Sequence, residues 1–475
     1  MRSVPMLSSD ILYTFPTVDQ KTVHKLLAEE LAGFNRKIVV LDDDPTGVQT
    51  VHDISVFTNW DTDSIRKGFE EQKSMFFIMT NSRSFTVPQT ISVHKEIMAN
   101  IAEVADREYI VISRSDSTLR GHYPTETQII KEEIERLTPK KIDGEIIIPF
   151  FKEGGRFTID NVHYVQEGEK LVPASMTEFA KDKSFAYKSS HLGDWCAEKT
   201  AGEFDPENME YISLESLRAL DLDTIENQLK NVNGFNKVIV NAIDYVDVQV
   251  FTIALVRALK AGKEFIIRGA AAITKVLGGV PDRPLLTREE LITEENENGG
   301  ILIVGSHVKK TTQQLEELMA SDLPIEFVEF NQHLVLDSNL LDQEIKRVVA
   351  VTDAKIREGR TVAVYTKRER FDLETSDRDK QLELSVRISD AVTSIFSQLT
   401  VRPNFIVAKG GITSSDIGTK ALKVKQAKVM GQLKPGVPVW MTGADSKFPD
   451  MPFIIFPGNV GGPTTLREAI EVLMK

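Results

Sequence analysis

The chain has 475 residues, with 57 Lys or Arg, 70 Asp or Glu and a formal net charge of −13. The length accommodates two or three domains, and the acidic balance argues against nucleic acid as a partner, because a phosphate backbone requires a basic face. The single cysteine, Cys196, excludes an intrachain disulfide and a cysteine-based zinc site. The apolar runs are too short to cross a membrane and none forms a signal peptide, so we expect a cytoplasmic protein with no membrane partner.

The first half of the chain predicts an α/β domain built on a mostly parallel sheet. Short apolar runs alternate with polar turns and amphipathic stretches, which is typical of strands covered by helices on both faces. We expect strands at 37–41, 75–80, 109–113, 145–150, 237–242 and 264–268, and helices near 88–105, 125–137 and 248–261. Between 157 and 173 this rhythm breaks, and the pattern predicts a β-hairpin inserted into the domain.

The polar stretch 293–300 has no periodicity and predicts a domain boundary, with an N-terminal domain at 1–295 and a C-terminal domain at 296–475. Beyond it we expect strands at 301–304, 325–330, 361–365, 405–408, 437–441 and 453–456, with helices between most of them. The second domain is therefore also expected to be a mostly parallel sheet flanked by helices. The lysines at 420, 423, 425 and 428 are interpreted as a solvated helix face.

Three turns that contain glycine follow strands of the C-terminal domain. They are Gly305-Ser306-His307, Lys409-Gly410-Gly411-Ile412-Thr413-Ser414 and Pro457-Gly458-Asn459-Val460-Gly461-Gly462. Glycine lets backbone N–H groups approach an anion, and a helix after the turn adds its positive end. Any one turn is better explained as a tight connection, but three on one sheet edge favour a phosphate cradle for a nucleotide. The P-loop and dinucleotide fingerprints are both missing, which disfavours a P-loop NTPase or a standard Rossmann dehydrogenase.

The N-terminal domain has acids at strand ends, where open parallel sheets bind ligands. Asp42, Asp43 and Asp44 are consecutive, and their carboxylates repel one another unless a cation or a substrate hydroxyl uses them. If the strand stayed extended, Asp43 would point away from its two neighbours. Asp116 ends another strand. Carboxylates suit the binding of hydroxyls and the acceptance of a proton, and the less favoured alternative is that Asp44 and Asp116 are turn and cap residues.

Arginines accompany these acids. Arg114 and Arg120 bracket Asp116, and Arg83 follows a third strand. A guanidinium group binds a carboxylate in a bidentate manner, so the combination of acids and arginines predicts a site for a small molecule that carries both hydroxyls and an acid group. The alternative is that these arginines pair with Asp44 and Asp116 at the surface.

These segments resemble the four-carbon acid sugar kinases, in order, from about residue 37 to the C-terminus. The matching segments are Asp43-Asp44-Pro45-Thr46-Gly47, Ser82-Arg83, Arg114-Ser115-Asp116-Ser117-Thr118-Leu119-Arg120-Gly121, Pro149-Phe150-Phe151, Gly155-Arg156, Val162-His163-Tyr164, Gly305-Ser306, Gly410-Gly411-Ile412-Thr413-Ser414 and Gly458-Asn459-Val460-Gly461. The block at 117–121 is the most specific of them. Arg114 stands where many members have Lys, and Pro45 replaces a common aliphatic residue, which indicates a divergent branch.

The resemblance implies that an acid-sugar domain precedes an ATP-binding domain. The reaction would transfer the γ-phosphoryl group of ATP, with Mg²⁺ bridging the phosphates, to the terminal hydroxyl of threonate, erythronate or a 3-oxo-tetronate. Nucleotide contacts are expected at Ser306, Gly410, Gly411, Ile412, Thr413, Gly458 and Asn459. Substrate contacts are expected at Asp43, Arg83, Arg114, Ser117 and Arg120, with Asp44 or Asp116 as the catalytic carboxylate.

Several alternatives stay open. The substrate could be another short acid sugar, including a branched one, and the protein could be a non-catalytic sensor that binds an acid sugar without consuming ATP. An acid-sugar oxidoreductase is a further alternative, which the missing dinucleotide fingerprint disfavours. The sequence does not say whether Asp44 or Asp116 accepts the proton, and it leaves the oligomeric state open, with a homodimer as one option.

Overall fold

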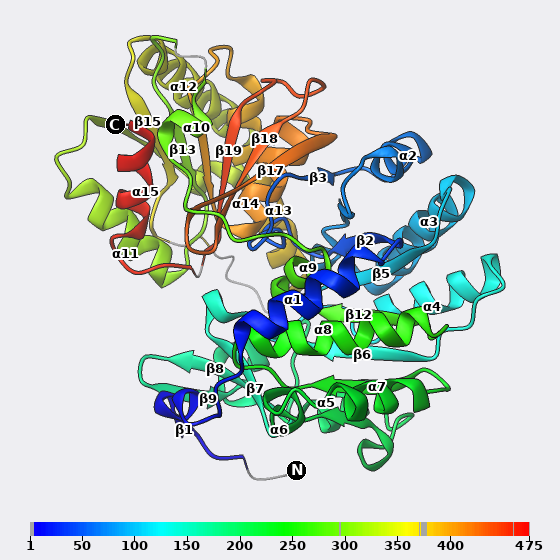
Figure 1. Cartoon of the computed structure of the whole chain (residues 1–475). Coiled ribbons are helices and arrows are strands. Elements are labelled where there is room, and N and C mark those ends of the chain that lie inside the picture. Colours follow the sequence, from blue (N-terminus) through cyan, green and yellow to red (C-terminus); the bar gives the residue numbers. More distant parts are fainter. Residues whose placement is uncertain (1–3, 294–295, 370, 372–377, 459, 475) are drawn as a thin grey trace. The chain divides into compact units, whose positions relative to one another are not determined.

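The computed structural model describes residues 4–293, 296–369, 371, 378–458 and 460–474, and the side chains of residues 378–382 are not described. Contacts divide the chain into two compact units, Met1–Asp282 and Arg283–Lys475. Each unit is an α/β structure in which helices cover a mostly parallel sheet (Figure 1), as the alternation of apolar runs and amphipathic stretches predicts.

The main sheet of the first unit is parallel and has the strand order β10-β11-β6-β12-β5-β2-β4-β3. Its strands are β2 (Lys37–Asp42), β3 (Ile54–Phe57), β4 (Met75–Met79), β5 (Tyr109–Arg114), β6 (Gly144–Ile148), β10 (Glu210–Ile212), β11 (Asn236–Val240) and β12 (Phe265–Gly269). β2 lies between β4 and β5, and Asp42 is in register with Met79 and Arg114. The polar segments that follow these three strands therefore meet at one edge of the sheet.

Helices cover both faces of this sheet. α2 (Thr62–Glu70), α3 (Val87–Val104) and α4 (Thr125–Leu137) enclose one apolar core with β2, β4 and β5. On the other side, α8 (Tyr245–Lys260) packs with α1 (Gln20–Ala32), α7 (Leu222–Asn231) and α9 (Ala271–Leu277). α8 is apolar almost all round and buried along most of its length, which explains why other helices surround it. The shorter α5 (Leu192–Lys199) and α6 (Leu214–Arg218) pack near β11 and α7.

The predicted insertion is present and is larger than a hairpin. β7 (Arg156–Ile159), β8 (Val162–Glu167) and β9 (Lys170–Pro173) form an antiparallel meander, and β1 (Leu7–Ser8) adds a fourth strand beside β9. Thr158 and Ala242 exchange backbone hydrogen bonds of 3.0 and 3.1 Å, which tie this small sheet to the segment that follows β11. The small sheet therefore stands at the carboxyl end of the main sheet.

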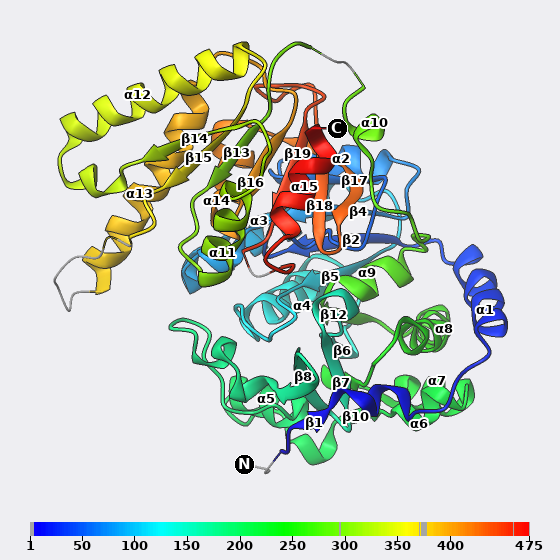
Figure 2. The same ribbon diagram turned by 90° about the vertical axis from the view of Figure 1, so that its left-hand side faces the viewer.

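The strands of the second unit, among the residues that the structure describes, lie in the order β17-β18-β19-β16-β13-β15-β14. The strands are β13 (Ile301–Val304), β14 (Ile325–Phe330), β15 (Thr361–Thr366), β16 (Ile406–Lys409), β17 (Gln426–Lys434), β18 (Val437–Thr442) and β19 (Pro452–Phe456). β17, β18 and β19 are antiparallel, and the remaining neighbours are parallel. Figure 2 shows the helices of this unit, which are α10 (Arg288–Leu291), α11 (Lys309–Met319), α12 (Ser338–Arg357), α13 (Arg378–Gln398), α14 (Gly411–Asp416) and α15 (Thr465–Met474).

Two features differ from the sequence interpretation. The lysine run is not a helix face: Lys428 lies in β17, where buried and less buried residues alternate, and Lys423 has a φ of 55°. Burial that alternates with a period of two is typical of a strand, and the run of lysines led to the helix interpretation instead. The second feature is the segment 283–292, which precedes the boundary placed after residue 295. Leu286 and Leu291 belong to the apolar core of the second unit, so packing joins this segment to that unit.

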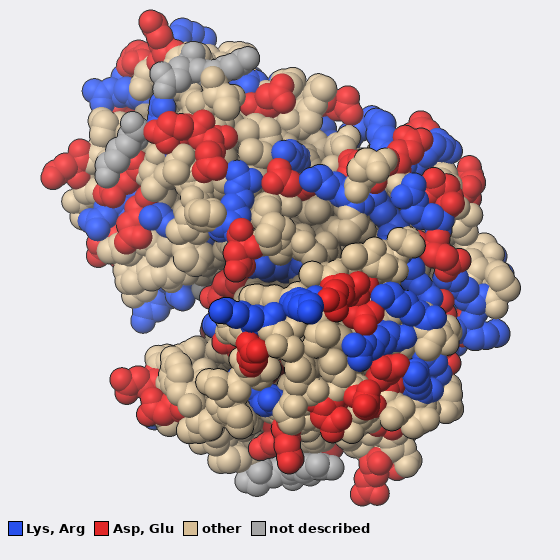
Figure 3. Space-filling model, in the orientation of Figure 1, with Lys and Arg blue, Asp and Glu red and all other residues tan. Residues whose placement is uncertain are grey.

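The surface drawn in Figure 3 carries charges of both signs. Lys and Arg side chains are interspersed with Asp and Glu over this face, in keeping with 57 basic and 70 acidic residues in the chain. Among the residues that the structure describes, no helix is both long enough and apolar enough to cross a membrane.

Candidate active site

The first carboxylate of the acidic run, Asp42, is part of the floor of the site. Its side chain is 3% exposed, and a Cβ at Gly47 would overlap the Asp42 carboxylate, so the turn after β2 needs glycine there. Burial raises the pKa of Asp42 to about 8, against the attraction of Arg114. Asp42 is therefore protonated at neutral pH, which relieves part of the repulsion that three adjacent carboxylates would create.

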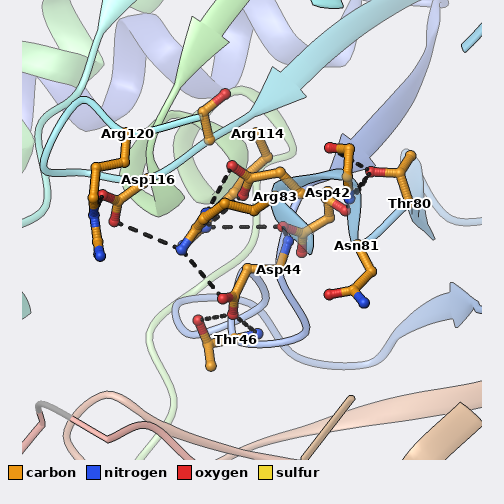
Figure 4. Close-up of polar contacts among 12 residues, drawn as sticks. Asp42, Asp44, Thr46, Thr80, Asn81, Arg83, Arg114, Asp116 and Arg120 are labelled. Carbon is orange, nitrogen blue, oxygen red and sulfur yellow. Dashed lines mark hydrogen bonds and ion pairs between the residues drawn. The ribbon is translucent and has the colours of Figure 1, made fainter. Parts of the chain in front are cut away.

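Arg83 binds the other two carboxylates (Figure 4). Its Nη2 and Nε donate to Asp43 at 2.6 and 3.1 Å, and its Nη1 donates to Asp44 at 3.2 Å. Asp44 also accepts hydrogen bonds from the backbone N and the hydroxyl of Thr46, at 2.8 and 2.5 Å. Although Asp44 is partly buried, which raises its pKa, Arg83 and Thr46 hold that pKa below the ordinary value. The chain turns after β2, so Asp43 and Asp44 reach the same guanidinium instead of opposite faces.

Asp116 lies on the other side of Arg83, in the turn that follows β5. Its Oδ1 is 3.9 Å from Arg83 Nη1, and its Oδ2 accepts hydrogen bonds from Arg120 Nε at 2.7 Å and from the Thr118 hydroxyl. Despite burial, Arg120 and Arg83 hold the pKa of Asp116 far below its usual range. Arg114 is 4% exposed and lies 3.8 and 3.7 Å from carboxylate oxygens of Asp42 and Asp43. The structure thus gathers the predicted acids and arginines into one network.

Side chains of the inserted strands and of the segment that follows them hydrogen-bond to the turn that contains Ser117. His163, on β8, is fully buried and donates through Nε2 to the Ser117 carbonyl at 2.7 Å, while its Nδ1 accepts from the Thr158 hydroxyl at 3.0 Å. Burial lowers the pKa of His163 to about 4, so the ring is neutral. Tyr187 donates to the Thr118 carbonyl at 2.8 Å. The insertion therefore fixes the turn that carries Asp116.

The three glycine turns of the second unit lie side by side, because β13, β16 and β19 are parallel neighbours. A Cβ at Gly305 would lie 2.6 Å from the Thr413 hydroxyl, and a Cβ at Gly410 would lie 3.2 Å from Ser306 Cβ. Gly410 has a φ of 121°, which side chains rarely adopt. A Cβ at Gly458 would lie 3.8 Å from the Ser306 hydroxyl. The predicted turns thus form one continuous rim.

Two further residues of the expected nucleotide site lie on this rim, and one lies outside the described residues. Gly411 begins α14, and Ile412 follows it with 68% of its surface exposed. A large apolar side chain that is this exposed beside a polar turn is available to pack against a ligand. Asn459 lies outside the described residues.

Comparison with known families agrees with the location of the acids and arginines in the first unit and of the glycine turns in the second. The model of a sugar-binding N-terminal domain matches residues 38–277, and the model of a nucleotide-binding C-terminal domain matches residues 301–466. The chain belongs to the four-carbon acid sugar kinase family. The acids and arginines described above fall in the sugar-binding domain of this kinase family, and the glycine rim falls in its nucleotide-binding domain.

Solved structures share the fold of this kinase-family chain. The Haemophilus influenzae protein HI1011 is similar with a TM-score of 0.59 and 16% identity, covering 92% of this chain and 100% of that one. A Salmonella typhimurium LT2 protein described provisionally as a tRNA synthase has a TM-score of 0.65 and 14% identity, covering 91% and 98%. At these identities the likeness shows the fold alone. No curated protein matches the chain.

Sequence reasoning missed a buried pair behind the acid-sugar site of this kinase-family chain. Glu126, on α4, accepts a hydrogen bond from the Ser82 hydroxyl at 2.6 Å and one from Arg268 Nη1 at 3.2 Å. Arg268 Nη2 and Asp43 Oδ2 each lie 3.3 Å from the place a Cβ of Gly121 would take. Glu126 and Arg268 thus form a second layer behind Asp43. Their positions, inside a helix and a strand, give no motif in the sequence.

Two cations beside the glycine rim were also missed. Lys409 is fully buried at the end of β16, where its Nζ donates to the Pro457 carbonyl at 2.5 Å. Arg368 Nη2 donates to the Ser306 carbonyl and to the Thr312 hydroxyl, both at 2.7 Å, and its Nε and Nη1 are buried without hydrogen-bond partners. Burial lowers the pKa of Lys409 to about 7. Neither cation pairs with a carboxylate among the described residues. The sequence signal that could have identified Lys409 is its position as a single lysine at the end of the apolar run 406–409.

Proposed function

We propose that the protein transfers the γ-phosphoryl group of ATP to the terminal hydroxyl of a four-carbon acid sugar of the threonate, erythronate or 3-oxo-tetronate type. The observation that carries this proposal is the array Asp44, Arg83, Asp116 and Arg120, joined by contacts of 3.2, 3.9 and 2.7 Å. It lies at the carboxyl edge of a parallel sheet, where such sheets bind ligands. Carboxylates, which can bind hydroxyls, alternate there with guanidinium groups.

The proposed catalytic carboxylates are Asp44 and Asp116. Their side chains keep 18% and 12% exposure within an otherwise buried network, so each can reach a ligand. Their pKa values are both lowered, so both are ionised at neutral pH and can accept a hydrogen bond from a hydroxyl. Phosphoryl transfer proceeds through a loose transition state and relies mainly on positioning. Orientation of the attacking hydroxyl is therefore the main role that we assign to them.

The glycine rim is the proposed site for the phosphates of ATP. Backbone N–H groups of Ser306 and of the turns at 410–413 and 458 would approach the phosphate oxygens, and Lys409 and Arg368 would add positive charge. The described residues contain no group of three or more His, Cys, Asp or Glu side chains able to hold a metal. We therefore expect Mg²⁺ to be bound chiefly by the nucleotide phosphates, where it would neutralise their charge.

The test measures ADP release from ATP and Mg²⁺ across four- and five-carbon aldonates, their oxo forms and branched acids. Release that depends on one acid sugar supports the proposal and identifies the substrate. D44N and D116N keep the side-chain size and are expected to lower kcat at least about a hundredfold, the usual effect of losing a positioned proton acceptor. If both variants kept the kcat of the wild type, the catalytic assignment would be wrong. Binding of acid sugar without any ADP release would indicate the sensor instead.

A further inference from the structure

Two of the predicted substrate arginines are already bound by protein carboxylates. Arg83 makes three hydrogen bonds to Asp43 and Asp44. Arg114 is 4% exposed and lies between Asp42 and Asp43. Arg83, which is paired with two fixed acids, has little left to offer to a ligand anion. Arg114 has an Nε that is buried without a hydrogen-bond partner, but its side chain is too enclosed to reach a ligand. The acid group of the substrate therefore needs another cation.

Arg156, at the start of β7, has the properties of that cation. Within the part of the chain that the structure describes, its side chain makes no ion pair and no hydrogen bond, and its Nε is buried without a partner. Burial lowers the pKa of Arg156, the nearby Asp116 carboxylate partly offsets that effect, and Arg120 adds to the lowering. A largely enclosed guanidinium that has an acid nearby but no salt bridge or hydrogen bond is only partly stabilised, whereas direct contact with a ligand carboxylate would stabilise it further.

Arg156 and Arg120 share one aromatic ring. The guanidinium carbon of Arg120 lies 5.0 Å from the centre of the Phe179 ring, and that of Arg156 lies 5.7 Å from it. The ring holds both planar groups by cation–π contact. Arg120 binds Asp116 through Nε, and its Nη1 lies 3.8 Å from Asp182. Asp116 thus lies near three guanidinium groups, those of Arg83, Arg120 and Arg156, and only Arg156 forms no direct ion pair with it.

We propose that Arg156 and Arg120, held by Phe179, bind the carboxylate of the acid sugar. This inference rests on the proposed function, and it gives the substrate a direction. The contacts run from Asp44 through Arg83 and Asp116 to Arg120. The acid group lies at the Phe179 end, and the hydroxyl that is phosphorylated lies toward Asp44. Recognition by this pair selects acid sugars over neutral polyols of the same length.

The test compares threonate with threitol, the neutral polyol that lacks the carboxylate, and adds erythronate as a second acid. Titration calorimetry measures the binding of each to the full chain without ATP, and ADP release gives the KM for the acids. The variants are R156A and R156K, which keeps the charge but loses the bidentate fork. R136A is the matched control, because Arg136 is 61% exposed on α4 and pairs with Glu133. The thermal shift produced by ATP checks that each variant is folded.

We expect R156A to weaken threonate or erythronate binding about tenfold to a hundredfold, the range of a lost charge-assisted hydrogen bond, with R156K in between and R136A unchanged. Threitol binding should be equally weak in all proteins. Equal affinity for the acids in R156A and wild type overturns the assignment while leaving the kinase proposal intact. A wild-type protein that binds an acid through Arg156 but releases no ADP supports the assignment and overturns the kinase proposal. A wild-type protein that binds neither acid overturns both.

Discussion

Replacing Lys409 with methionine should abolish a proton uptake that accompanies nucleotide binding. Burial, with a contribution from Lys310, lowers the pKa of Lys409 to about 7. At pH 8 about a tenth of the free protein therefore carries the charge. A phosphate on the adjacent glycine turns favours the charged form, and a return of the pKa toward 10 would make protonation nearly complete. Binding should then take up about 0.9 of a proton at pH 8 and much less at pH 6, where Lys409 is already mostly protonated.

Titration calorimetry in two buffers of different ionisation enthalpy measures this uptake. A non-hydrolysable ATP analogue is the ligand, and at pH 8 its phosphates are already ionised because their second pKa lies near 6. K447M is the matched control. Lys447 also donates to backbone carbonyls, those of Phe396 and Ser397, but it lies between β18 and β19, at the opposite edge of the sheet from the glycine rim. It should keep the full uptake, whereas K409M should lose it.

Two results would refute this reasoning. An uptake near zero in the wild type at pH 8 would mean that Lys409 either keeps an ordinary pKa or does not sense the nucleotide. An equal uptake in K409M and wild type would mean that another group takes up the proton. A fall in nucleotide affinity for K409M without any change in uptake would place Lys409 in packing alone, because a purely structural lysine has no reason to titrate with the ligand.

Three further outcomes follow from particular contacts. G305A places a Cβ 2.6 Å from the Thr413 hydroxyl, so it should reduce the thermal shift caused by ATP and leave acid-sugar binding unchanged. E145L removes one partner of the fully buried ion pair Lys237–Glu145, whose charged atoms are 2.7 Å apart. It should lower the free energy of unfolding by about 3–5 kcal/mol and lower the melting temperature. The double variant E145L/K237M should melt at a higher temperature than either single variant. His163 has a pKa of about 4 in the fold and about 6.5 when unfolded. The unfolded chain therefore binds more protons between these values, and wild-type stability should fall relative to H163Q by up to about 3 kcal/mol as the pH drops from 6.5 to 4 in denaturation series.

The fold was predictable where strands are apolar and bounded by turn residues. The strands expected at 301–304 and 325–330 have those bounds in β13 and β14, and the helix at 125–137 is α4. β17 was missed because its lysines hide an alternation in which Ala427, Val429 and Leu433 are buried. A strand of this kind is recognised by its period of two, but the run of lysines was interpreted as a helix face instead.

The candidate site was predictable in its location and less so in its pairings. The rule that ligands bind at the carboxyl ends of parallel strands selected Asp44, Arg83 and Asp116 together. Which cation binds which acid depends on the turn after β2, and the sequence does not encode that path in any short pattern. Arg156 and Lys409 were missed for a different reason. Arg156 begins β7 and Lys409 ends β16, and only the absence of a salt bridge in an enclosed position distinguishes each from a surface cation.

Each unit contains enclosed cations that form no salt bridge with a carboxylate among the described residues. Several cations of the first unit are paired with carboxylates, as Arg83 is with Asp43 and Arg268 is with Glu126. Within the described residues the sugar-binding domain leaves Arg156 without an acid partner, and the nucleotide-binding domain leaves Arg368 and Lys409 without one. A buried charge without a counterion destabilises the free protein, and an anionic ligand removes that cost on binding. Among such cations, Arg156 lies beside the acid-sugar site, and Arg368 and Lys409 lie beside the glycine rim, where an acid-sugar kinase would need to bind a carboxylate and a polyphosphate.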